Sequence, residues 1–534
     1  TAAVRALTTA AIAALDTQQV LALSTAQTTV LTSTQIQAMS TDQIAALDTA
    51  DFANLKSSHI AALSTAQAAA IETTDIAALN TVNVRALTVD AVSSLTTDQV
   101  AHLLSSQIAA LTSSQAASFS SAQAAAIETR DISAMSTHAV RTLSTAAIAA
   151  LDTSQIQALN TAQTSALTST QVQALTSEQI AALESADLAA LKSTQVAALN
   201  TTQAQAIETR DIQPLTSVNV RSLTTDAISA LSTAQIQALT TAQTSTLTTF
   251  QMSALTSAQV AALESTDLAV MSSAQIARLD STQAGAIETS DIGALSTLAT
   301  RALTTDALTG LSTSQIASLK SAQIGALSSM QTAALNTDQA AAIETSDIGA
   351  MSTLALRALS TAAVAALDTN QILALNTAQT STLTSLQVQA LTSAQVAALE
   401  SSDLSTLKST QVAVLDTSQA AALETRDISA LHTINVRALS TAAINALSTD
   451  QIKALNTAQT YALTTAQTSA LQSAQMAALE SSDFAVLTSA QVAAFNSIQV
   501  AAIETADIRA LSTAAIRALN TEALTGLSTD QIAR

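Results

Sequence analysis

The sequence lacks most of the residues on which enzymes, disulfide-linked domains and tight turns depend. It has no cysteine and no tryptophan, one proline and six glycines in 534 residues, and aromatic side chains make up 1% of it. Without cysteine there is no disulfide framework and no thiolate metal site. With so little proline and glycine, turns have to come from Ser, Thr, Asp and Asn, whose side chains bond their own nearby backbone.

Charge is also scarce, and its sign is unbalanced. Lys and Arg number 19 against 39 Asp and Glu, which gives a net charge of −20. An acidic chain of this kind has no electrostatic footprint for nucleic acid. The hydrophobic content is 48%, but Ser, Thr and Gln recur every few residues, so no apolar run approaches the roughly 18 to 20 residues of a membrane span. We therefore expect neither a nucleic-acid partner nor a membrane-spanning segment.

What the chain has instead is an eight-residue repeat. From Leu7 to Leu527 every eighth residue is a large apolar side chain, without insertion or deletion. We number the octad positions 1 to 8, with position 1 at residue numbers divisible by eight. Because no linker or composition shift interrupts the register, we expect residues 1–534 to be a single continuous array. Both ends fall inside an octad, so we expect the array to be an excerpt of a longer one.

The octad pattern predicts a short capped helix. Position 1 is mostly Ser, Thr, Asp or Asn, position 4 is usually Gln or Asp, position 5 is Ile or Val, and position 8 is Leu. Positions 1 to 4 resemble a capping box, and positions 5 and 8 share one helix face. In one long helix the Leu stripe would drift by roughly 80° per octad. We therefore predict one helix of about two turns per octad.

Such short helices are unstable alone and must bury their apolar face against neighbouring octads. The predicted fold is thus an all-α repeat solenoid or superhelix. A β-solenoid is the alternative, because Thr, Ile and Val favour strands. We prefer helices, since the two apolar positions are three residues apart and Ala is depleted in strands.

A longer repeat modulates the octads. The unit Glu-Thr-x-Asp recurs after seven, ten, ten, seven, ten and ten octads, so that 80- and 56-residue blocks build a 216-residue higher repeat. We call these pairs the station acids: Glu72/Asp75, Glu128/Asp131, Glu208/Asp211, Glu288/Asp291, Glu344/Asp347, Glu424/Asp427 and Glu504/Asp507. An arginine follows each Glu by thirteen positions, and we call these the station arginines: Arg85, Arg141, Arg221, Arg301, Arg357, Arg437 and Arg517.

Other substitutions follow the same intervals. Second acidic octads occur in the 80-residue blocks, at Asp48/Asp51, Glu184/Asp187, Glu264/Asp267, Glu400/Asp403 and Glu480/Asp483. Position 5 is Ala before most stations, at Ala68, Ala124, Ala204, Ala284, Ala340 and Ala420, and Thr at Thr28, Thr164, Thr244, Thr380 and Thr460. A small or polar residue at a core position indicates a close backbone approach or a corner. We infer that the 80- and 56-residue blocks form larger turns of a superhelix.

The station acids are the candidate site residues, and two interpretations apply to them. Two carboxylates near a turn can contribute to a calcium site, which needs roughly six to eight oxygens; the candidates are Glu72, Asp75, Glu128, Asp131, Glu208 and Asp211. Acids at a helix N-terminus also cap amides without a metal, and the station arginines are available as counter-ions. We favour capping and salt bridges, and expect no cofactor.

No catalytic constellation is visible. The histidines, His59, His102, His138 and His432, fall at four different octad positions, and no Ser/His/Asp arrangement or glycine-rich phosphate loop stands out. We therefore expect a non-enzymatic protein. The Ser and Thr rows at positions 1 and 2 are explained as caps, and their alternative role is to bind ice or glycan.

The unit at residues 239–247, Leu-Thr-Thr-Ala-Gln-Thr-Ser-Thr-Leu, resembles the Ala/Thr/Leu octapeptide arrays of very large bacterial surface or secreted proteins. The resemblance covers the whole chain and implies an extracellular or cell-surface structural role, as a fibre, sheath, tube or surface layer. No catalytic residue carries over from it.

Near-identical repeats expose faces that match copies of the same chain, and open contacts of this kind generate filaments. The expected partner is therefore the chain itself. The expected assembly stations are the station arginines and the second acidic octads, among them Glu184, Asp187, Glu264 and Asp267. The alternative function is an adhesin or an ice- or glycan-binding module.

Overall fold

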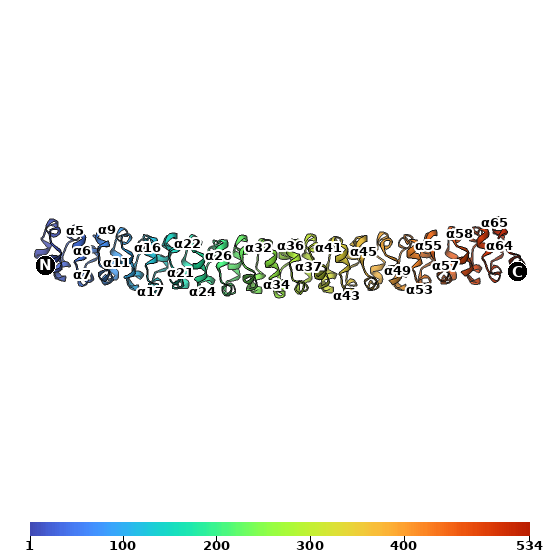
Figure 1. Ribbon diagram of the computed structural model, residues 1–534, viewed down its shortest axis with the longest axis horizontal. Helices are drawn as coiled ribbons and strands as arrows, with labels where there is room; N and C mark the ends of the chain where they lie inside the picture. Colours follow the sequence, from blue (N-terminus) through green and yellow to red (C-terminus); the bar gives the residue numbers. More distant parts are fainter. The chain divides into compact units, whose positions relative to one another are not determined.

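The computed structural model describes residues 1–534 and is helical throughout, with no β-strand. The predicted all-α repeat solenoid is confirmed, and the β-solenoid alternative is not supported. The chain forms two compact units, unit 1 at Thr1–Leu263 and unit 2 at Glu264–Arg534. In sequence, the octad register continues from one unit into the next. Within each unit the helices follow one another in chain order (Figure 1).

Each octad forms one helix whose first residue is position 2. The 66 α-helices have four to six residues, and all but α1 (Ala2–Arg5) begin at that position. One stretch shows the pattern: α9 (Thr65–Ala69), α10 (Thr73–Ala78), α11 (Thr81–Ala86), α12 (Val89–Ser93), α13 (Thr97–Ala101), α14 (Ser105–Ala110), α15 (Ser113–Ala117) and α16 (Ser121–Ala125). The octad at 288–295 departs from it, with a 3₁₀ helix, η1 (Ile292–Ala294).

The predicted cap at position 1 is confirmed for Ser, Thr, Asp and Asn. In α13, the Thr96 hydroxyl accepts the Gln99 amide at 3.1 Å, and the Gln99 side chain accepts the Thr96 amide at 2.8 Å. This is the reciprocal capping box that the sequence predicts. Where the box forms, two amide groups at the helix start are thereby satisfied locally.

The helices are shorter than the predicted two turns because positions 8 and 1 are extended. Leu87 has φ −54° and ψ 133°, and Thr88 has φ −68° and ψ 159°. No residue has a positive φ, so the turns do not need glycine, which explains its scarcity. None of the resulting helices has the length and apolar character required to cross a bilayer.

The helices wind into a coil in which each helix packs against the third helix after it. For example, α20 (Thr153–Gln157) contacts α23 (Ser177–Ala182), and α55 (Thr441–Ala446) contacts α58 (Thr465–Ala470). Position 5 and position 8 side chains fill the interior, as with Ile156 and Leu159, which are 0% and 4% exposed. Burying these side chains stabilises the fold by about 0.8 kcal/mol per CH₂ group. Summed along the array, this gain offsets the cost of forming helices this short.

The position 4 glutamines join successive turns, a role that the sequence analysis missed. The Gln395 amide donates to the Val364 carbonyl at 3.0 Å and to the Leu367 carbonyl at 2.6 Å, 31 and 28 residues earlier. Its oxygen accepts the Thr392 amide of its own helix at 2.8 Å. Most position 4 glutamines repeat this geometry and are nearly fully buried. One turn of the coil therefore takes between three and four octads.

Candidate functional site

The acidic octads line up along one edge of the coil within each unit. At between three and four octads per turn, a block of ten octads fits three turns and a block of seven octads fits two. In Figure 1 the acidic helices α7 (Thr49–Asn54), α17 (Thr129–Ile132) and α24 (Ser185–Ala189) share one edge of unit 1. Within unit 2, α34 (Ser265–Val270), α43 (Thr345–Ile348) and α53 (Thr425–Ala430) likewise share one edge. We call this edge of a unit its acidic edge.

Each second acidic octad packs against a station octad. Helix α7 contacts α10, α24 contacts α27 (Thr209–Ile212), and α50 (Ser401–Thr406) contacts α53. The two acidic pairs of one block therefore lie on adjacent turns. The longer blocks thus place four acidic side chains, two from each octad, on neighbouring helices.

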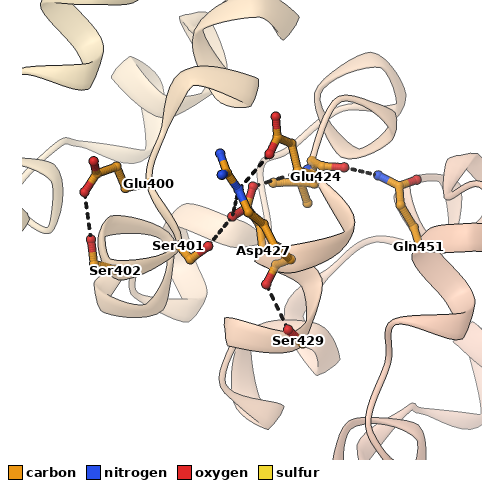
Figure 2. Close-up of polar contacts among 9 residues, drawn as sticks. Glu400, Ser401, Ser402, Glu424, Asp427, Ser429 and Gln451 are labelled. Atoms are coloured by element: carbon orange, nitrogen blue, oxygen red, sulfur yellow. Dashed lines mark hydrogen bonds and ion pairs between the residues drawn. The ribbon is translucent and has the colours of Figure 1, made fainter.

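Most position 4 aspartates of the acidic octads are buried and accept hydrogen bonds from hydroxyl groups of the preceding turn. The Thr49 hydroxyl donates to Asp75 at 2.7 Å, and Ser401 donates to Asp427 (Figure 2). The station aspartates all have such a donor, 26 residues earlier: Thr49, Ser105, Ser185, Ser265, Ser321, Ser401 and Ser481. A carboxylate has no donor, so at these octads the hydroxyl contact replaces the glutamine link.

Two of the five core threonines have the same explanation. The Thr28 hydroxyl donates to Asp51 at 2.7 Å, and the Thr460 hydroxyl donates to Asp483 at 2.9 Å. Both threonines are 0% exposed and lie three octads before the aspartate that they contact. The constant offset of three octads between the threonine octads and the second acidic octads was the sequence signal for this pairing.

Most station glutamates do not cap their helices, so the predicted capping is wrong for them. Glu72, Glu128 and Glu208 each stand at the N-cap without a side-chain cap bond. Asp48, by contrast, accepts the Asp51 amide at 2.8 Å. The longer Glu side chain extends outward instead, consistent with the N-cap preference for Asp, Asn, Ser and Thr.

The geometry gives no support to calcium at the station acids. The structure holds no group of three or more His, Asp or Glu side chains arranged as metal ligands. At each pair the Glu is exposed, as with Glu72, whereas the Asp is directed inward to a hydroxyl, as with Asp75, which is 3% exposed. The two carboxylates of a pair therefore have different surroundings.

Ion pairs at the stations use other arginines than predicted. Arg130, Arg210 and Arg426 stand at position 3 of their station octads and pair with Glu128, Glu208 and Glu424 at 2.6 to 2.7 Å. Figure 2 shows the Glu424–Asp427 station with this contact. The predicted counter-ions, the station arginines, make no ion pair within the chain and are exposed: Arg85, Arg141, Arg221, Arg301, Arg357, Arg437 and Arg517.

Most station arginines have an exposed apolar neighbour, which the sequence analysis missed. Position 3 of the same octad lies one helical turn before the arginine, on the same face. The side chains there are Val82, Val218, Leu298, Leu354 and Ile434, each 62 to 70% exposed. At the remaining two stations the residue is His138 or Ala514. The recurrence of large apolar residues ten positions after the station Glu was the available signal.

One station arginine, Arg437, lies beside a surface groove. Arg437, on α54 (Thr433–Ala438), lines the groove together with Tyr461 and Thr465 of the next turn and Val486 beyond it. Tyr461 is the only tyrosine of the chain and is 59% exposed. The groove joins an arginine, an aromatic ring and hydroxyl groups on one surface.

The alanines at position 5 before the stations coincide with a close approach between turns, as the sequence predicts. Ala284 is 0% exposed in α36 (Ser281–Gly285), which packs against α38 (Thr305–Thr309). A Cβ built on Gly285 would lie 2.6 Å from the Gly310 carbonyl oxygen. The small residues therefore permit this backbone contact.

Burial shifts the acidity of several position 4 aspartates. It raises the pKa of Asp51, Asp75, Asp187 and Asp483, and the hydroxyl donors partly oppose the rise. Burial, reinforced by the neighbouring Glu400 carboxylate, raises the pKa of Asp403 to about 6. These side chains favour the protonated state in the folded chain relative to the unfolded one.

We expect Asp403→Asn to remove a pH dependence of stability. Because the folded pKa lies above the unfolded value, the stabilisation is complete below about pH 4 and is lost as the pH rises through 6. The difference corresponds to about 2 to 3 kcal/mol of local stability at pH 7.5. Asparagine avoids the buried charge and supplies a donor, as Asn435 does to the Leu407 carbonyl at 2.8 Å.

The measurement is hydrogen exchange of α50 at pH 5 and pH 7.5, corrected for the intrinsic exchange rate. Exchange in the variant should be slower at pH 7.5 and should lose the wild-type difference between the two conditions. The exposed Asp450→Asn is the matched control. A variant that keeps the wild-type pH difference contradicts the assignment to Asp403.

Comparison with known proteins identifies the repeat. A family model described as the ALTTAQ repeat matches most of the chain, at residues 12–49, 44–70, 68–105, 124–161, 148–185, 180–206, 204–241, 284–321, 340–377, 396–433, 420–457, 434–465 and 500–534. A search of curated proteins gives no match.

Proposed function

Because the chain belongs to the ALTTAQ repeat family, we propose that it is a non-enzymatic structural protein that assembles with copies of itself. The assembly is a filament, tube, sheath or surface layer, located outside the cell or on the cell surface. The likeness of its octads to those of bacterial surface arrays supports that location.

One observation carries the proposal. Exposed station arginines without an intramolecular partner, most with an exposed apolar neighbour, recur in both units at the intervals of the exposed station glutamates. Single exposed apolar residues are ordinary on a protein surface. Their recurrence beside an unpaired arginine is typical of a contact surface, because interfaces are enriched in arginine.

A binding module for glycan is the second candidate, and the groove at Arg437 and Tyr461 favours it. An aromatic ring beside hydroxyl and guanidinium donors is suited to a sugar ring. The groove is a local feature, since tyrosine occurs once in the chain. The position 1 hydroxyls favour glycan or ice less, because most of them accept amides of their own helices, as Thr96 does.

Negative-stain microscopy and sedimentation of the purified chain over a range of concentrations test the two candidates. We expect ordered filaments or sheets, and a sedimentation coefficient that rises with concentration. Dispersed particles at every concentration, together with measurable affinity for a glycan array, would overturn the structural proposal in favour of the binding module.

A further inference from the structure

The two charged rows of each unit lie on different sides of the coil. The station arginines are one octad beyond the station acids in sequence. One octad is about a third of a turn, because a turn takes between three and four octads. Since both rows repeat at the same intervals, each row keeps its side along the unit. Each unit therefore presents an acidic side and a separate basic side.

The acidic side keeps carboxylates available for a partner. Glu72, Glu288, Glu344 and Glu504 are exposed and make no ion pair within the chain. The arginines on the other side are equally unpaired, and their aliphatic neighbours, such as Leu298, are about two-thirds exposed. Within each unit, a surface complementary to each side is thus present on the other side.

Resting on the proposed self-assembly, we infer that the partner is a second, parallel copy of this chain, whose acidic edge docks on the row of station arginines and their apolar neighbours. Such a contact is heterologous, because two different surfaces meet. Each copy keeps one free acidic side and one free basic side, so the contact propagates to further copies. Charge complementarity here selects the partner and its orientation.

The unequal station spacing defines the stagger between copies. In unit 2 the station glutamates are Glu288, Glu344, Glu424 and Glu504. Only one axial alignment matches all four arginines with four acidic stations. Sliding one copy by ten octads matches two of them, and sliding by seven octads matches one. Equal spacing would have allowed the same station contacts at every step, so the shorter block leaves a single alignment in which every arginine meets a station glutamate.

The test reverses the charge of each row separately in the full chain. The changes are made at the stations of unit 2 whose glutamates have no ion pair. One variant, the basic-row variant, carries Arg301→Glu, Arg357→Glu and Arg517→Glu. The other, the acidic-row variant, carries Glu288→Lys, Glu344→Lys and Glu504→Lys. Lysine is tolerated at octad position 1, which Lys320 and Lys408 already occupy.

A matched pair of variants separates position from net charge. The neutralised variant carries Arg301→Gln, Arg357→Gln and Arg517→Gln. The control variant carries Thr305→Glu, Thr361→Glu and Thr521→Glu, at exposed positions two octads after the station Glu and therefore outside both rows. Both changes make the chain more negative by the same amount, but only the first alters the row of station arginines.

We expect the basic-row variant and the acidic-row variant, each alone, to need at least about tenfold higher concentration than the wild type to assemble. The reason is that three attractive charge pairs become repulsive. The neutralised variant should assemble less readily than the control variant. An equimolar mixture of the two reversed variants should regain assembly, because each supplies the charge that the other lacks. Circular dichroism checks that all variants keep the helical fold. Added salt should weaken wild-type assembly, as expected for exposed charges.

Three results would contradict the inference or its premise. If the wild type assembles and the basic-row variant assembles equally well, the docking surface is wrong while the structural function stands. If both reversed variants fail and their mixture does not recover, the two rows do not pair with each other. If the wild type never assembles, the proposed function itself fails.

Discussion

Replacing Gln395 by leucine is expected to lower the local stability of the coil by about 3 to 5 kcal/mol. The change removes the acceptor of the Thr392 amide and the donor of the Val364 and Leu367 carbonyls. The Leu367 carbonyl is buried and loses its donor, and an unpaired buried group costs about 1 to 3 kcal/mol. The Val364 carbonyl keeps the Leu367 amide at 3.3 Å, and the Thr392 amide is partly buried. Leucine fills a similar volume, so the loss comes from hydrogen bonds and not from a cavity.

Hydrogen exchange of α45 (Thr361–Ala366) and α49 (Ser393–Ala398) measures this effect. Both helices should exchange faster in the variant, because the glutamine joins the octads on which they lie. Gln389→Leu is the control, since this glutamine is exposed at position 6. Equal protection in Gln395→Leu and Gln389→Leu would show that the hydrogen bonds from Gln395 to the earlier turn contribute nothing to stability. Because repeat arrays unfold locally, exchange is more informative than a single melting temperature.

Gly310→Ala is expected to separate two turns of unit 2 and to cost about 3 kcal/mol or more. An added Cβ would overlap the backbone carbonyl of Ser281, and a backbone atom cannot move aside as a flexible side chain does. The contact is held in place by Asp306, whose carboxylate accepts the Ser281 amide at 3.0 Å. The usual gain from replacing a helical glycine by alanine, up to about 1 kcal/mol, is too small to compensate.

Gly349→Ala is the matched control, because its Cβ would meet the Ala374 carbonyl oxygen at 3.2 Å, a contact that a small shift relieves. We expect its stability to change by no more than about 1 kcal/mol. Thermal unfolding together with exchange of α36 and α38 distinguishes the two variants. A Gly310→Ala protein as stable as Gly349→Ala would mean that the two turns that meet at Gly310 can separate without cost.

Local structure was predictable because its causes lie within one octad. Thr96 and Gln99 are three positions apart, so their capping box follows from the sequence alone. The predicted helix length was wrong because residues such as Leu87 and Thr88 are extended. Their extended conformation depends on where the chain must bend to continue the coil. The predicted caps were wrong at glutamates such as Glu72 for a local reason. Glutamate carries a negative charge, but its side chain is longer than those of the residues preferred at an N-cap.

The candidate site was predictable only in part. The sequence located the station acids and the station arginines by their spacing. It paired them with each other, whereas the structure pairs Arg130 with Glu128 and leaves Arg141 exposed and unpaired. It also attributed the core threonines to a corner, whereas Thr28 donates to a buried aspartate 23 residues later. Those partners depend on the number of octads per turn, which no pattern within an octad specifies.

The sequence by itself therefore determined the helical octad, its cap at position 1, its apolar face and the alternation of ten-octad and seven-octad blocks. Each of these follows from the order of residues along the chain and from backbone stereochemistry. Only the tertiary structure decided that a turn takes between three and four octads, and with it which side chains meet. The physical reason is that the turn is defined by packing and by hydrogen bonds between distant octads, such as those of Thr28 and Gln395. These contacts exist only after the coil has formed.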